Sequence, residues 1–279
     1  MIYDVKEGPL LVNTHATAVG QQIVEVVLNT PEALNALNGD MVDLLLEHVP
    51  AWEADDNVIA ILMRGAGSKA FCAGGDIRQL YREIDAGNQH VGEVFFNHEY
   101  EMDLMLHNLA TPLVVWGNGY VIGGGMGLLQ SAAIRIGTQS SRLAMPEVTI
   151  GLFPDVGASY FLRQVPDQLG LFFGLTGAML NATDGRQLGL LDGLLYDDHY
   201  QQLMQCLLAM PSQSQQATLV QLKGKVLALE ATTSEMPESN LDHHRAEIIS
   251  AINQVELADI ISGLSNLKGN FIKVSWKSS

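Results

Sequence analysis

The chain has 279 residues, enough for one large domain or two smaller ones with a full core. Apolar residues make up 47% and charged residues 16%, an ordinary balance for a globular protein. With 15 Lys and Arg against 31 Asp and Glu, the formal net charge of −16 argues against non-specific binding to nucleic acid or to anionic membranes.

The first part of the chain alternates between strand and helix patterns. Residues 23–28 are rich in β-branched side chains, which favours a strand, and the apolar spacing from residue 40 to 49 favours a helix with one buried face. The continuous apolar run at 58–63 is typical of a strand covered on both faces. Strand, helix and strand in this order predict a parallel pair joined by a crossover.

The same pattern returns further along the chain. A loop at 65–75 precedes a predicted helix at 76–85, and a break at 87–92 precedes a second predicted helix at 95–108. The remaining predicted elements are helices at 124–131, 169–175 and 184–190, and strands at 113–116 and 134–138. Repeated strand–strand–helix units of this kind predict a layered, spiral α/β core, which we expect over residues 1–198.

The last part of the chain, residues 199–279, reads as mainly helical, with a polar break at 232–239 and two amphipathic helices within 241–264. We expect this region to cover the core or to mediate assembly. The pair His243-His244 is interpreted as solvated rather than as a metal site. Adjacent residues point to different faces of a helix, and no acidic or Cys partner has the spacing of a ligand.

The two cysteines, Cys72 and Cys206, define no disulfide framework and favour a reducing compartment. The first residues lack the basic start and apolar run of a signal peptide, and no uninterrupted apolar stretch is long enough to span a bilayer. We therefore expect a cytoplasmic protein without a membrane partner. Cys72 could be a nucleophile, but a small buried residue is the favoured interpretation because no His lies near it in sequence.

The segment from residue 111 to 155 carries the strongest indication of chemistry. A buried strand leads into Gly123-Gly124-Gly125, and the carboxylates Glu147 and Asp155 follow. Glycines let the backbone come close to a ligand, and the free amides at a helix start can point at a developing oxyanion. Nearby carboxylates could attack a carbonyl or activate water, so the segment predicts chemistry on a carbonyl.

Two motifs resemble a known family. The string SKAFCAGGDI at 68–77, followed by the glycine triplet, resembles the crotonase (enoyl-CoA hydratase/isomerase) superfamily, and the likeness runs over about residues 24–195. The string AMPEVTIGLFPDVG at 144–157 is similar to the 3-hydroxyisobutyryl-CoA hydrolase branch of that superfamily. The resemblance implies a crotonase-like spiral of ββα units with a helical C-terminal region, and an acyl-CoA thioester as substrate.

The resemblance also implies roles for single residues. The backbone amides of Gly75 and Gly124 correspond to the oxyanion hole, and Glu147 and Asp155 to the catalytic carboxylates. The implied substrate contacts are Glu99, Gly124, Glu147 and Asp155, and the implied CoA contacts are Lys69, Ala70, Ala73 and Gly74. Without the resemblance, Glu147 could simply begin a helix, Asp155 could be a turn residue and Glu99 an exposed helix residue.

Position 127 separates the activities within the superfamily. Hydratases of the family place a Glu three residues after the middle glycine, where this chain has Gly127. We therefore expect hydrolysis of a short, branched β-hydroxyacyl-CoA, with 3-hydroxyisobutyryl-CoA of valine breakdown as the favoured substrate and no metal or redox cofactor. The alternatives are a hydratase or isomerase that uses Glu147 alone, and a noncatalytic acyl-CoA-binding subunit.

The end of the chain departs from the family pattern. Members of the hydrolase branch usually continue beyond the position where this chain stops, at Trp276-Lys277-Ser278-Ser279. We therefore expect a truncated or divergent C-terminal region. In the superfamily, helices of this region help to close the pocket and form subunit contacts, so a homo-oligomer is a further expectation.

Overall fold

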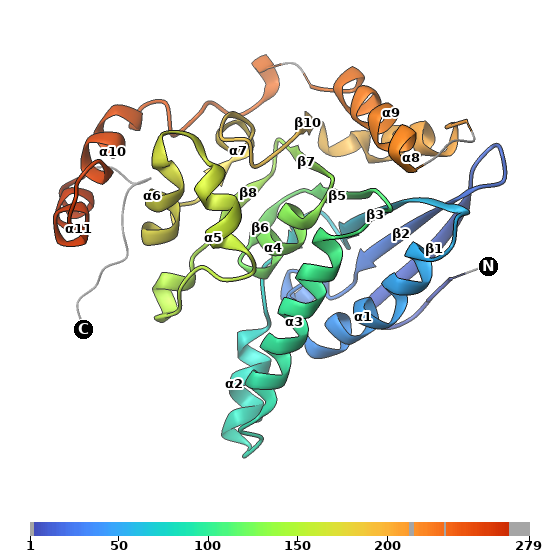
Figure 1. Ribbon diagram of the computed structural model, residues 1–279, viewed down its shortest axis with the longest axis horizontal. Coiled ribbons are helices and arrows are strands. Elements are labelled where there is room, and N and C mark those ends of the chain that lie inside the picture. The colour runs from blue at the N-terminus through green and yellow to red at the C-terminus, as the bar shows by residue number, and fades with distance from the viewer. Residues whose placement is uncertain (1–2, 212–214, 232, 268–279) are drawn as a thin grey trace.

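Two β-sheets with helices around them make up the structure, a computed structural model that describes residues 3–211, 215–231 and 233–267 (Figure 1). Among these residues, the larger sheet has six strands in the order β1-β2-β3-β5-β7-β10, and the smaller has four in the order β4-β6-β8-β9. The strands are β1 Leu10–Ala16, β2 Gln22–Leu28, β3 Val58–Gly65, β4 Ala70–Cys72, β5 Leu113–Gly117, β6 Tyr120–Ile122, β7 Ile134–Thr138, β8 Arg142–Ala144, β9 Leu180–Asn181 and β10 Gly193–Leu195.

The helices lie outside and between the sheets. In chain order they are α1 Gly39–Glu53, α2 Ile77–Asp85, α3 Val91–His107, α4 Gly124–Ser131, α5 Ala158–Phe161, α6 Leu169–Thr176, α7 Ala182–Gln187, α8 Tyr200–Leu208, α9 Gln215–Ala228, α10 Arg245–Ile252 and α11 Leu257–Asn266. Figure 1 shows α10 and α11 at the opposite end of the molecule from α1 and β1. Within the described part of the chain, no helix is both long and apolar enough to cross a membrane.

Successive strands alternate between the two sheets. From β3 to β8, the odd-numbered strands belong to the larger sheet and the even-numbered strands to the smaller. The chain pairs β2 with β3, β3 with β5, and β5 with β7 in parallel, and it pairs β4 with β6 and β6 with β8 in parallel. Each turn of the chain therefore adds one strand to each sheet, which confirms the predicted spiral and the predicted parallel pair at residues 23–28 and 58–63.

Both faces of the larger sheet are buried, which explains its continuous apolar strands. In β3, Ile61 and Met63 join the core that contains α1, α3 and α4, whereas Ala60 and Leu62 join a second core on the other face. Helices α8 and α9 supply that second core with Leu203, Leu207, Leu222 and Val226. These two helices thus cover the outer face of the larger sheet, as expected for part of the last third of the chain.

The structure differs from the predictions mainly in its short elements. The strands β1, β4, β6, β8, β9 and β10 were not predicted, and β4 lies inside the segment 65–75 that was interpreted as a loop. Helix α3 begins at Val91, inside the predicted break at 87–92, and α7 ends at Gln187 rather than at residue 190. The two helices predicted within 241–264 are α10 and α11. The final residues 276–279 lie outside the described residues, and the boundary between 198 and 199 stays a prediction.

Candidate active site

The predicted site residues follow three parallel strands of the smaller sheet. Gly75 follows β4, Gly124 follows β6 and Glu147 follows β8. Parallel strands end at the same edge of a sheet, so these three loops meet there. Together with Glu99 of α3 and Asp155, they line one cavity of about 130 Å³. The structure therefore brings together all five residues that the resemblance implied for the oxyanion hole, the carboxylates and the acyl contacts.

Glycine is required where the first two loops touch. Gly74 has φ +93°, and a Cβ there would lie 3.5 Å from the amide nitrogen of Gly124. Gly123 has φ +54°, and a Cβ there would lie 2.8 Å from Oε1 of Glu147. Larger residues would strain the backbone and separate these loops. Among the described residues, the amides of Gly75 and Gly124 donate no hydrogen bond, so both are free to hold a carbonyl oxygen.

Glu147 is buried without full hydrogen bonding. Its residue is 8% exposed, and its Oε2 has no partner within the described residues. Burial, and to a lesser extent the charge of Asp155, raises the pKa of Glu147 to about 7, although a hydrogen bond to its own backbone acts in the opposite direction. A carboxyl group that titrates near neutral pH can both give and take a proton during a reaction.

Glu99 lies on the buried side of α3 rather than on its exposed side. It is 2% exposed and shares that side with Phe95, Met102 and Leu106. Burial, followed by the charges of Asp155 and Glu147, raises the pKa of Glu99 to about 8. At neutral pH its carboxyl group is therefore mostly protonated and can donate a hydrogen bond into the cavity.

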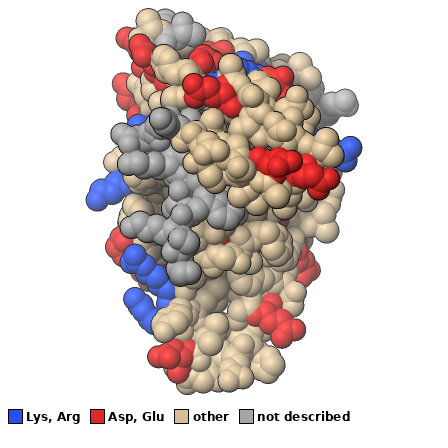
Figure 2. Space-filling model, turned by 90° about the vertical axis from the view of Figure 1, so that its left-hand side faces the viewer, with Lys and Arg blue, Asp and Glu red and all other residues tan. Residues whose placement is uncertain are grey.

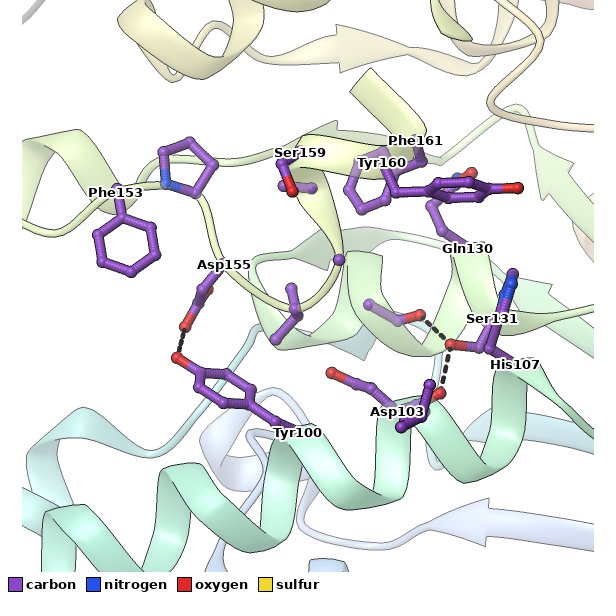
Figure 3. Close-up of a pocket in the computed structure, with 16 residues that line it drawn as sticks. Tyr100, Asp103, His107, Gln130, Ser131, Phe153, Asp155, Ser159, Tyr160 and Phe161 are labelled. Atoms are coloured by element: carbon purple, nitrogen blue, oxygen red, sulfur yellow. Dashed lines mark hydrogen bonds between the residues drawn. The ribbon is translucent and has the colours of Figure 1, made fainter. Parts of the chain in front are cut away.

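Asp155 lies in the loop that separates two cavities. The hydroxyl of Tyr100 donates a hydrogen bond of 2.7 Å to its Oδ2 (Figure 3). The next residue, Val156, has φ +42°, an uncommon conformation for a β-branched residue. Asp155 and Val156 line both the small cavity and a larger one of about 540 Å³ between α3, α4 and the loop at 153–161. Sequence reasoning did not find Tyr100, although it directly follows Glu99 on a predicted helix.

Position 127 has no room for a side chain. A Cβ on Gly127 would lie 2.7 Å from Cβ of Val156 and 3.1 Å from Oδ2 of Asp103. The loop that carries Asp155 thus occupies the space beside α4 that a residue larger than glycine would need. A glutamate at this position would require the loop or α3 to move.

Cys72 is buried in the layer beneath the glycine turns. Burial raises the pKa of its thiol to about 12, so the reactive thiolate is rare at neutral pH. A side chain at Gly125 would overlap the backbone carbonyl of Cys72. These contacts agree with the small buried residue that the sequence favoured, and they argue against a nucleophile.

The residues expected to contact CoA divide into two pairs. Ala73 and Gly74 line the small cavity, whereas Lys69 is exposed and Ala70 is buried within β4, and neither of these two lines it. Their roles in binding CoA stay a prediction. His243 is exposed, and the described ranges contain no group of three His, Cys, Asp or Glu arranged to hold a metal ion. The face in Figure 2 is mostly uncharged, with acidic and basic groups scattered over it.

Comparison with known proteins extends the resemblance to almost the whole chain. The family model described as enoyl-CoA hydratase/isomerase matches residues 23–277. The chain is 37% identical to the mitochondrial 3-hydroxyisobutyryl-CoA hydrolase of Xenopus tropicalis over 77% of its length and 54% of that protein. It is 33% identical to the human protein of the same name over 96% of its length and 67% of that protein. The chain spans about half the length of the first curated relatives it matches.

Solved structures agree on the architecture. A carnitinyl-CoA dehydratase from Mycobacterium thermoresistibile superposes with a TM-score of 0.77 and 31% identity, covering 94% of this chain and 72% of that one. The alternating two-sheet spiral is thus the crotonase fold predicted from the two motifs. Fold, motifs and family model lead to one conclusion: the chain belongs to the enoyl-CoA hydratase/isomerase family.

Proposed function

We propose that this protein hydrolyses a short, branched β-hydroxyacyl-CoA thioester, with 3-hydroxyisobutyryl-CoA as the favoured substrate and 3-hydroxyisobutyrate and CoA as products. One observation carries the proposal: the free amides of Gly75 and Gly124 and the buried carboxyl of Glu147 line the same small cavity, while position 127 has no side chain. The relatives named 3-hydroxyisobutyryl-CoA hydrolase, at 32–41% identity, support the choice of substrate.

The two amides would stabilise the charge that develops on the thioester oxygen. Gly124 is the first residue of α4, where backbone amides have no partner inside the helix. Gly75 lies in the adjacent loop, so the two amides can point at one oxygen from different segments. Removal of one such donor typically costs an enzyme about 10²–10³ in kcat.

Glu147 would supply the group that acts on the carbonyl carbon. In one route its carboxylate forms a C–O bond as the C–S bond breaks, and water then hydrolyses the mixed anhydride. In the other, Glu147 takes a proton from a water molecule that attacks directly. Both routes require ionised Glu147, and a pKa of about 7 keeps a large fraction ionised at neutral pH.

Asp155 and Glu99 would orient the substrate and move protons. Asp155, which accepts a hydrogen bond from the Tyr100 hydroxyl, would bind the β-hydroxyl or help to protonate the departing thiolate. Glu99, mostly protonated at neutral pH, can donate a hydrogen bond at the polar end of the cavity. The four expected CoA contacts, Lys69, Ala70, Ala73 and Gly74, would place CoA along residues 69–74, with nearby basic side chains at its phosphates.

The proposal includes no metal or redox cofactor, because a thioester carbonyl is already activated for attack. The reaction would place the protein in valine breakdown. A homo-oligomer and a cytoplasmic location stay predictions, and the names of several relatives include the word mitochondrial. Nucleic acid remains an unexpected partner because of the net charge of −16.

A hydratase or isomerase is the second candidate. The name of the M. thermoresistibile neighbour, a dehydratase, favours it, and Glu147 could exchange protons with an acyl chain. Such an enzyme would have to use one carboxyl for proton transfers that hydratases of the family commonly divide between two. The crowding at Gly127 leaves no space for the second carboxyl on α4.

Free-thiol release from 3-hydroxyisobutyryl-CoA, measured beside hydration of crotonyl-CoA, tests the proposal. The wild type should release thiol without hydrating crotonyl-CoA, and Glu147→Gln should lower the release by about a hundredfold or more while the protein stays folded. Hydration without thiol release would reject the hydrolase in favour of the second candidate. If folded protein binds acyl-CoA without turnover of either substrate, the noncatalytic subunit becomes the better explanation.

A further inference from the structure

Two carboxyl groups of α3 pack against two glycines of α4. Oε1 of Glu99 lies 2.5 Å from the position that a Cβ on Gly124 would take, and Oδ2 of Asp103 lies 3.1 Å from that of Gly127. The two acidic residues are four apart on α3 and the two glycines are three apart on α4, so each pair shares a face of its helix. The carboxyls therefore occupy space that side chains on α4 would otherwise fill.

Asp103 is the less expected member of this pair. It is 8% exposed and lines the larger cavity of about 540 Å³, and in the described part of the protein neither of its carboxyl oxygens has a hydrogen-bond partner (Figure 3). The hydroxyl of Ser131 donates to the backbone oxygens of Asp103 and Gly127 instead. A buried carboxylate without donors is costly, whereas a neutral carboxylic acid is tolerated much better.

The charges around Asp103 do not favour its ionisation. Glu99, Asp155, Tyr100 and Cys72 interact electrostatically with Asp103. The other titratable groups that line the same cavity are His107 of α3 and Tyr160 of α5. Of the described residues, no Lys or Arg lines either cavity. Burial, followed by the charges of Glu99 and Asp155, raises the pKa of Asp103 well above its ordinary value.

We propose that Asp103 is a positioning residue that works as a neutral carboxylic acid: it packs against Gly127, keeps α3 close to α4 and so holds Glu99 beside Gly124. The effect on thioester hydrolysis rests on the proposed function, whereas the protonation of Asp103 does not. Loss of the proton would place a negative charge beside Glu99 and Asp155 and draw water in from the larger cavity. The contact between α3 and α4 would then loosen, and the Gly124 amide would lose its fixed neighbour.

Two substitutions separate the shape of Asp103 from its proton. Asp103→Asn keeps the size of the neutral acid and its ability to hydrogen-bond, and Asp103→Leu keeps the branched shape in a larger side chain without polar atoms. The Asn variant should rescue function, with kcat/KM for thiol release at least tenfold above that of the Leu variant. Equal losses in the two variants would overturn the positioning role.

Unfolding measured against pH tests the proton without any substrate. Folded wild type should hold a proton that the unfolded chain releases above about pH 4. The unfolding constant of the wild type, divided by that of Asp103→Asn, should therefore increase at least tenfold between pH 5 and pH 8. An infrared band of a protonated carboxyl at pH 7 should also disappear in the Asn variant.

These outcomes can fail independently of the hydrolase proposal. A pH-independent ratio of unfolding constants, with no infrared difference, would show that Asp103 is ionised and would overturn the inference. If wild type releases no thiol, the proposed function fails, and the unfolding ratio and the infrared band still decide whether Asp103 is neutral. If Asp103→Leu does not fold, the Asn variant alone provides both of these measurements.

Discussion

Two buried glutamates of this protein have opposite surroundings. Glu25 on β2 is 6% exposed and Glu147 after β8 is 8% exposed, so burial hardly distinguishes them. Burial alone would raise the pKa of Glu25, yet hydrogen bonds from Tyr200, Arg64 and His15 lower it to about 2. Glu147 has no such set of donors, and its pKa is raised to about 7. The supply of donors, rather than depth, decides the charge of a buried carboxyl here.

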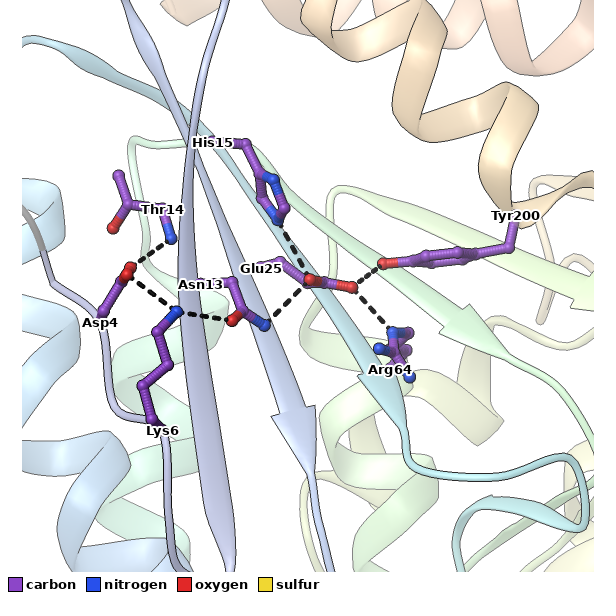
Figure 4. A network of polar contacts seen from close by, with 8 residues as sticks. All are labelled: Asp4, Lys6, Asn13, Thr14, His15, Glu25, Arg64 and Tyr200. Atoms are coloured by element: carbon purple, nitrogen blue, oxygen red, sulfur yellow. Dashed lines mark hydrogen bonds and ion pairs between the residues drawn. The ribbon is translucent and has the colours of Figure 1, made fainter.

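The donors around Glu25 come from several elements (Figure 4). Tyr200 of α8 donates at 2.5 Å, Arg64 of β3 at 2.8 Å and Asn13 of β1 at 3.1 Å. The Arg64 guanidinium also lies 5.2 Å from the centre of the Tyr200 ring, a cation–π contact. The network therefore ties the edge of the larger sheet to the helix that covers it, which is a structural role. In the site, by contrast, Glu99 and Glu147 each have a carboxyl oxygen without a hydrogen-bond partner among the described residues, and both have raised pKa values.

Glu147→Gln should break the functional half of this comparison, with the largest effect. A loss of about 10²–10⁴-fold in kcat for thiol release is expected, because the amide can neither attack nor accept a proton. Stability should stay equal or increase, because a poorly solvated carboxyl is removed. Steady-state kinetics and urea unfolding measure the two effects. A variant that is inactive because it is unfolded would not support the assignment.

The pH dependence of stability should have opposite signs at the two glutamates. Relative to its Gln variant, wild-type Glu25 contributes stability above pH 4.5 that is lost as the pH falls towards 2. The folded state holds the Glu147 proton, so its contribution is instead lost as the pH rises from 4.5 to about 7. Each shift corresponds to roughly 3 kcal/mol. Unfolding of wild type and both Gln variants from pH 3 to 8 would show crossing trends, and parallel trends would contradict the comparison.

Glu25→Gln should weaken the structural hydrogen-bond network around residue 25. A loss of about 2–3 kcal/mol is expected, because the partly buried Arg64 and the Tyr200 hydroxyl lose a charged acceptor. Thiol release by the folded variant should stay near that of the wild type, because Glu25 does not line the small cavity. Chemical denaturation beside kinetics would check both, and a large loss of kcat in fully folded protein would link the two regions unexpectedly.

Tyr100→Phe is the mildest test, since it removes one donor from one site carboxyl. The hydrogen bond to Asp155 should contribute about 1 kcal/mol, so kcat/KM should fall about fivefold. The matched control is Tyr160→Phe, which removes the hydroxyl of another exposed tyrosine that lines the same larger cavity. Equal effects of the two substitutions would indicate that the Asp155 contact has no special role.

The sequence revealed the long, regular features and missed the short ones. The strand at 58–63 was predicted from its continuous apolar run and the helix from residue 40 from its apolar spacing, and both are present as β3 and α1. Strands of three residues, such as β4, β6 and β8, are too short for a period-2 pattern, and β4 and β6 also lie inside glycine-rich stretches. These are the strands that assemble the site, so their parallel alignment was visible only in three dimensions.

The site residues also divide into those that the sequence revealed and those that it missed. Glu147 and the glycine turns have a local signature, whereas Asp103 has none beyond its spacing of four from Glu99 on a predicted helix. That spacing could have indicated a shared buried side, since Phe95, Glu99, Met102 and Leu106 follow helical periodicity. Asp103 is recognised by its contact with Gly127, a residue of another helix that has no side chain.

The rate at which Cys72 is chemically labelled can measure motion at the site. Its thiol is buried beneath the two glycine turns, whereas Cys206 is partly exposed on α8, the helix whose Leu203 and Leu207 pack against the other face of the larger sheet. A thiol-modifying reagent can reach Cys72 only when the loops around it open, so its labelling rate divided by that of a free thiol reports the opening equilibrium. The native chain thus reports how often the loops of the candidate site separate, with Cys206 as the internal reference.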